Sequence, residues 1–176
     1  ALENKNIHQQ MFALDLIKNM NLQKWTSKLN SMLKSEDDEI KKQILHLAYE
    51  KNNFIDEDLL LNLSKQDDQI GAIAISLFDK NTITKNLNEL SNQLYSTNPH
   101  KIASTAVAIL KHDPEHIKAK VILNNFLDIK DESTTAIALD YLKNSISLLP
   151  EKTLIDLLNH TSIEISKSAL NVAGNR

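Results

Sequence analysis

The chain has 176 residues, 41% of them hydrophobic, and a net charge of −3, so it is long enough and apolar enough to bury a sizeable core. It contains two glycines and no cysteine. Because hairpins and βα loops depend on glycine, the composition favours an all-α fold over a sheet, and it excludes disulfide and thiol chemistry.

One helical pattern recurs at intervals of 30 to 32 residues, and it predicts how the chain is organised. Each copy is centred on one residue, which we call the anchor. Apolar residues follow the anchor at one, three and four positions, which is the spacing of one helix face. The stretch from Thr134 to Asn144 also alternates like a strand, but this spacing predicts a helix there. The anchors are Ala13, Ile44, Ala74, Ala106, Ala138 and Ala169.

Polar residues with short side chains mark the expected start of each anchored helix. Asp37, Asp67, Asp131 and Ser162 lie seven residues before their anchors, where a side-chain oxygen accepts from unpaired backbone N–H groups. In the fourth copy Asn98 precedes Pro99, which suits a cap followed by the first helical position.

A second set of apolar stripes lies between the anchored helices and predicts one further helix before each of them. Each repeat is therefore predicted to be a pair, in which a first helix precedes the anchored second helix. The stripes are Leu22, Leu29, Met32 and Leu33; Leu59 to Leu63; Ile83, Leu87, Leu90 and Leu94; Ile117, Val121, Phe126 and Leu127; and Leu154 to Leu158.

This pattern resembles the HEAT-like α-helical repeats, especially the short bacterial kind, over nearly the whole chain. The resemblance implies a right-handed α-α superhelix, an armadillo-like α-solenoid of about five helix-pair repeats plus an N-terminal half-repeat. We expect one domain over residues 1–176, and we interpret it as a fragment of a longer protein. HEAT repeats often have a capping Asp followed by Val-Arg and then Ala, and here the position of that Arg, three residues before each anchor, reads Gln10, Lys41, Gly71, Ala103, Thr135 and Ser166.

No catalytic residue, metal ligand or cofactor site is predicted. None of the six histidines is followed by Glu, the dipeptide that binds iron in HEAT-like deoxyhypusine hydroxylases. His112 and His116 are four residues apart, but Pro114 between them predicts that they lie on different helices. A loop between repeats is therefore favoured over a metal site at this segment.

In HEAT-like stacks the second helices line the concave side, so their outward positions are the candidate partner-binding surface. Two interpretations are kept for the small residues among them, which would admit a peptide close to the backbone or would let neighbouring helices pack tightly. The candidate partner-binding residues lie two positions before or after their anchors and are Lys42, His46, Ala72, Ser76, Ser104, Ala108, Ala136 and Asp140.

The expected function is a non-catalytic, cytoplasmic scaffold or interaction module that binds a protein or peptide partner on its concave face. Nucleic acid is disfavoured because acidic and basic residues are interleaved and a basic face is missing. Insertion of this segment into a membrane is not expected, because no apolar run is long enough. The alternative is a cytoplasmic regulatory or accessory domain of a membrane transporter, and a lyase or other enzyme subunit is the third.

If the anchors are correct, Ala74, Ala106 and Ala138 are buried at equivalent places in successive second helices. Ala106→Leu should then overpack the helix contacts and lower the free energy of unfolding by about 1–3 kcal/mol. Urea denaturation followed by circular dichroism measures this change, and an unchanged midpoint would contradict the repeat register.

Overall fold

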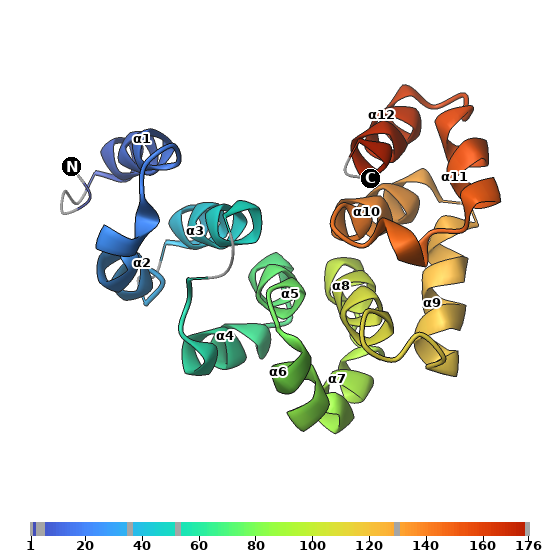
Figure 1. Cartoon of the computed structure of the whole chain (residues 1–176), viewed down its shortest axis with the longest axis horizontal. Helices are drawn as coiled ribbons and strands as arrows, with labels where there is room; N and C mark the ends of the chain where they lie inside the picture. Colours follow the sequence, from blue (N-terminus) through green and yellow to red (C-terminus); the bar gives the residue numbers. More distant parts are fainter. Residues whose placement is uncertain (1, 3–5, 35–36, 52–53, 129–130, 175–176) are drawn as a thin grey trace. The chain divides into compact units, whose positions relative to one another are not determined.

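A computed structural model describes residues 2, 6–34, 37–51, 54–128 and 131–174. These residues form helices joined by short connections and include no strand, so the predicted all-α class is confirmed. The chain divides into two compact units, Ala1–Leu77 and Phe78–Arg176, and each is described by itself. Figure 1 labels their helices.

In the Ala1–Leu77 unit the three anchored second helices, α1, α3 and α5, pack side by side (Figure 1). The first helices α2 and α4 pack against α3 and α5, respectively. The elements are α1 (Ile7–Ile17), the 3₁₀ turn η1 (Leu22–Lys24), α2 (Thr26–Met32), α3 (Asp38–Glu50), α4 (Glu57–Ser64) and α5 (Gln69–Ser76).

The Phe78–Arg176 unit repeats this arrangement with the second helices α8, α10 and α12 (Figure 1). Helix α7 packs against α8, helix α9 packs against both α8 and α10, and α11 packs against α12. The elements are α6 (Lys80–Lys85), α7 (Leu87–Gln93), α8 (Pro99–Leu110), α9 (Ile117–Leu127), α10 (Glu132–Leu142), the 3₁₀ turn η2 (Ile146–Leu148), α11 (Glu151–Leu158) and α12 (Ile163–Ala173).

Every anchor is buried on a second helix, as the repeat spacing predicts. Ala74, Ala106 and Ala138 have no exposed surface, and Ala13 is 3% exposed. The ambiguous stretch from Thr134 lies in α10 and is helical through Leu142. The helical register of the sequence is therefore confirmed.

Three of the predicted caps hold their helices through side-chain hydrogen bonds. The Asp37 carboxylate accepts from the Ile40 N–H at 2.9 Å, and Asn98 and Asp131 act in the same way on α8 and α10. Ser162 occupies the cap position of α12 without a side-chain bond.

The remaining predicted cap, Asp67, is wrong by one residue. Helix α5 begins at Gln69, so the residue with extended backbone before it is Asp68, and its carboxylate accepts from the Gly71 N–H at 2.9 Å.

Two of the predicted first helices are interrupted. The stripe from Ile83 to Leu94 is divided between α6 and α7 at Asn86, whose backbone N–H and side-chain amide both donate to the Thr82 carbonyl, at 3.1 and 2.8 Å. Such a local side-chain bond competes with helix continuation. The stripe that begins at Leu22 is likewise divided, between η1 and α2.

Helix α9 forms where it was predicted, but its buried face is different. Ile117 and Val121 are exposed, whereas Ala119, Leu123 and Leu127 are buried. The three buried residues are four apart, so they form one face with a small residue in its first turn. The prediction counted the larger side chains, so it was wrong at Ile117 and Val121 but correct at Leu127.

Gly71, the third residue of α5, lies against the end of α4. A Cβ at this position would collide with the Gln66 carbonyl oxygen and would lie 3.3 Å from the Leu63 carbonyl oxygen. Both are backbone atoms, which cannot rotate aside. A side chain at this repeat position, such as the Arg of typical HEAT repeats, therefore does not fit here.

Gly71→Ala should lower the free energy of unfolding by about 1–3 kcal/mol, because α4 and α5 must separate to admit the methyl group. Gly174→Ala is the matched control, since its Cβ would lie 3.5 Å from the nearest neighbour, the Leu170 carbonyl oxygen. Urea denaturation of both variants measures the difference. Equal stability of the two variants would contradict the tight α4–α5 contact.

Candidate functional site

Three of the eight candidate partner-binding residues are buried. Ala72 and Ser104 have no exposed surface, and Ala108 is 3% exposed. The Ser104 hydroxyl donates to the Lys101 carbonyl of its own helix at 3.1 Å. A partner cannot contact these side chains without rearranging the helices, so burial favours the packing interpretation at these positions.

The other five candidates keep accessible surface. Lys42 and His46 lie on α3 and Ser76 ends α5, all in the first unit, whereas Ala136 and Asp140 lie on α10 in the second. Ser76 is half-buried, and its hydroxyl donates to the Ile73 carbonyl at 2.6 Å. We treat the two groups as separate local surfaces.

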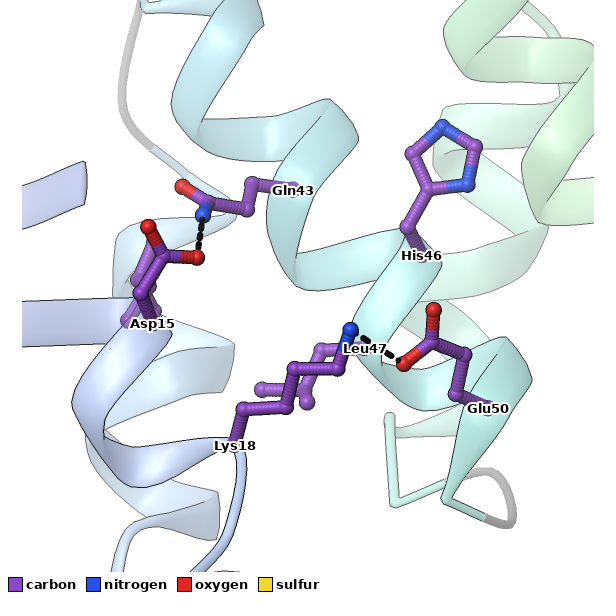
Figure 2. A pocket seen from close by; sticks show the side chains of 7 residues that line it. Asp15, Lys18, Gln43, His46, Leu47 and Glu50 are labelled. Carbon is purple, nitrogen blue, oxygen red and sulfur yellow. Dashed lines mark hydrogen bonds and ion pairs between the residues drawn. The ribbon is translucent and has the colours of Figure 1, made fainter. Parts of the chain in front are cut away.

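A small pocket lies between the adjacent second helices α1 and α3, beside His46 (Figure 2). Its volume is about 70 Å³, which accommodates a few water molecules or one small polar group. Its lining residues are Leu14, Asp15, Lys18, Gln43, His46, Leu47 and Glu50.

Two polar contacts cross this pocket from one helix to the other, as Figure 2 shows. The Gln43 side-chain amide donates to the Asp15 carboxylate at 2.9 Å, and the Lys18 ammonium is 2.8 Å from the Glu50 carboxylate. The hydrogen bond that Lys18 donates to Glu50 raises the pKa of Lys18, and the Glu50 charge adds to this effect while burial opposes it. Lys18 therefore remains a cation beside two carboxylates.

Lys42 lies one helical turn before His46 on α3. Its ammonium is 2.8 Å from the Glu39 carboxylate. This hydrogen bond raises the pKa of Lys42, burial opposes it, and the charges of Glu39, Asp38 and the α5 cap Asp68 contribute less. The pocket and Lys42 thus place charges of both signs along the edges of α3.

In the second unit the corresponding contact between adjacent second helices joins α8 to α10. The Tyr141 hydroxyl lies 3.4 Å from His100 Nδ1, and the two rings meet edge to face with centroids 6.1 Å apart. Burial lowers the pKa of His100, and the charge of Asp140 partly offsets that shift. Asp140 is itself paired with Lys143 at 2.8 Å.

His100 was not among the residues singled out from the sequence. The repeat register gives the positions of both residues, because His100 lies six residues before its anchor, Ala106, and Tyr141 lies three after the next anchor, Ala138. Nothing in a single sequence shows that these two positions touch until the packing of α8 against α10 is known.

The histidines of the HDPEH segment lie where the proline predicted. His112 follows the end of α8, and His116 caps α9, with its Nδ1 atom accepting from the Ala119 N–H at 3.2 Å. In the part of the chain that the structure describes, His, Asp and Glu side chains nowhere gather in groups of three or more suited to a metal ion. None of the described helices is both long and apolar enough to cross a membrane.

Comparison with known proteins identifies no family. No protein-family model matches the chain, and no curated protein matches it. One solved structure, described as an engineered protein, aligns with 99% of this chain and 94% of its own at 18% sequence identity, with a TM-score of 0.40. Similarity at this level supports no inference about fold or function.

His100 should make the stability of the chain depend on pH. Because burial lowers its pKa in the folded state, the unfolded chain takes up this proton more readily, and stability is lost as the pH falls below the ordinary value of 6.5 and through the folded-state pKa. His100→Gln should therefore lose less unfolding free energy than the wild type between about pH 7.5 and about pH 5.5.

Urea denaturation at the two pH values makes this comparison. His8→Gln, at an exposed position on α1, is the control and should keep the wild-type dependence. Burial and nearby lysines lower the pKa of His112 as well, so part of the dependence should persist in His100→Gln. An identical pH dependence of stability in His100→Gln and the wild type would contradict a lowered pKa of His100 in the folded state.

Proposed function

We propose that this chain is a non-catalytic protein-interaction module, a HEAT-like right-handed α-α superhelix whose second helices form a concave binding face. Two features of the described residues support the proposal. Anchors at intervals of 30 to 32 residues are all buried. Within each unit the second helices pack next to one another, as α1, α3 and α5 or as α8, α10 and α12.

The pocket between α1 and α3 is the observation that carries the proposal. At about 70 Å³ it is far smaller than the ~300–1,000 Å³ of pockets that enclose small-molecule ligands. A free substrate or cofactor would leave most of its surface in water there. A single side chain of a larger partner fits this size, with the rest of the partner lying along the helices.

The chemistry of the pocket also suits a peptide segment. Leu14 and Leu47 supply apolar surface, and Asp15, Lys18 and Glu50 surround it with both signs of charge. An apolar centre with a polar rim is the usual arrangement of a protein interface. His46 adds an exposed ring beside the rim, and Lys42 lies one turn away. On α10, Ala136 and Asp140 offer a similar mixture of small and charged surface.

Peptides selected from a random library on the immobilised chain test this proposal. Titration into ¹⁵N-labelled chain should shift the backbone amides of Asp15, Lys18, His46 and Glu50. His46→Ala should weaken binding on the order of tenfold, the effect of losing one important interface residue. His8→Ala, exposed on α1 but outside the pocket lining, should leave the affinity unchanged.

Two results would contradict the proposal. One is that no library peptide binds above background. The other is that the amide shifts, and the substitutions that weaken peptide binding, map to residues outside both groups, the group on α1 and α3 and the group on α8 and α10.

A further inference from the structure

Two second helices carry apolar stripes that are open to solvent. On α1, Phe12 and Leu16 are 64% and 57% exposed, and Met20, just beyond the helix, is 56% exposed. Phe12 and Leu16 are four residues apart and lie along one face of the helix. On α12, Ile163 and Leu170 are 70% and 63% exposed and are seven residues apart, which is two helical turns.

Two of these repeat positions, those of Leu16 and Leu170, are buried on the other second helices. Leu16 lies three residues after its anchor, and Leu170 lies one residue after its anchor. At three after the anchor the buried equivalents are Leu47, Leu77, Ile109, Tyr141 and Val172. At one after the anchor they are Leu14, Leu45, Ile75, Val107 and Leu139.

Contacts inside the units show which neighbour each position faces. Gln43, one residue before its anchor, donates to Asp15 on the preceding second helix α1. Tyr141, three residues after its anchor, lies against His100 on the preceding second helix α8. These positions therefore face the preceding helix, and on α1 they are occupied by Phe12 and Leu16.

The opposite face follows from the same contacts. His100 lies six residues before its own anchor and faces the following second helix, α10. On α12 the residue at that position is Ile163, and Leu170 lies on the same stripe two turns later. Helix α12 thus exposes the face that accepts a following helix, and α1 exposes the face that accepts a preceding one.

We propose that these two stripes are complementary halves of one interface, formed when α12 of one copy of the chain packs against α1 of a second copy. The contact continues by one step the packing that already joins α1 to α3 and α10 to α12. By analogy with the Tyr141–His100 contact, Leu16 of one copy lies against Ile163 of the next. Both sides are apolar, so association removes five large side chains from water.

The proposed interface joins two different surfaces, so the association is head to tail and each copy keeps one open face. One pair of short helices buries less than the roughly 1,000 Å² expected of a stable complex. We therefore expect weak assembly that grows with concentration, with dissociation constants on the order of 10–100 μM.

Sedimentation velocity of the full chain between about 10 μM and about 1 mM tests the proposal, because this range spans the expected dissociation constants. The wild type should shift from monomer to larger species. Leu16→Glu blocks the α1 face and Leu170→Glu blocks the α12 face, so each variant alone should remain a monomer. An equimolar mixture of the two should form a dimer and nothing larger, since one intact face of each kind remains.

Ile117→Glu is the matched control, because Ile117 is 80% exposed on α9 and lies outside both stripes. It should assemble like the wild type, and circular dichroism should show all three variants folded. The proposal is overturned if the wild type stays monomeric at the highest concentration, which would assign the stripes to another occupant, such as a further repeat or a different protein. It is equally overturned if a blocked variant still self-associates, if the mixture stays monomeric, or if Ile117→Glu abolishes assembly.

Discussion

Within each unit, the packing of each second helix against the next is the interaction on which the other features of the fold depend. Five of the six anchors are alanine, and small side chains at the contact let neighbouring helix axes approach closely. A single helix pair cannot bury both of its apolar faces, so neighbouring pairs supply the missing cover. The register of this packing also decides which outward residues come together, because it aligns fixed repeat positions on adjacent helices.

The polar contacts on the accessible surface follow from that register. Gln43 with Asp15, Lys18 with Glu50, and Tyr141 with His100 each join one second helix to its neighbour. These residues therefore have a structural task as well as the proposed binding task. A partner that enters the α1–α3 pocket exchanges existing contacts for new ones, so its net gain is smaller than the contacts that it makes.

The sequence predicts the second helices well because their pattern repeats, so each copy tests the register of the others. It predicts less where one local bond decides, as at Asn86, or where a small residue carries the buried face, as Ala119 does on α9. The candidate site shows the same limit. Ala108 and His46 occupy equivalent outward positions, each two residues after its anchor, yet Ala108 is buried and His46 is exposed. Side-chain burial depends on how closely the neighbouring helix approaches, which a single sequence does not encode locally.

The apolar stripes of α1 and α12 are unusual for helix faces that meet water, where polar side chains normally lie. Here Leu16 and Leu170 keep the apolar character of the inner copies although both are more than half exposed. A large apolar side chain gains about 1.5–3 kcal/mol on full burial, so covering these faces lowers the free energy whichever helix supplies the cover. Since the inner copies already show how such faces pair, the helix that fits best is one with the same repeat positions, and every copy of this chain carries one.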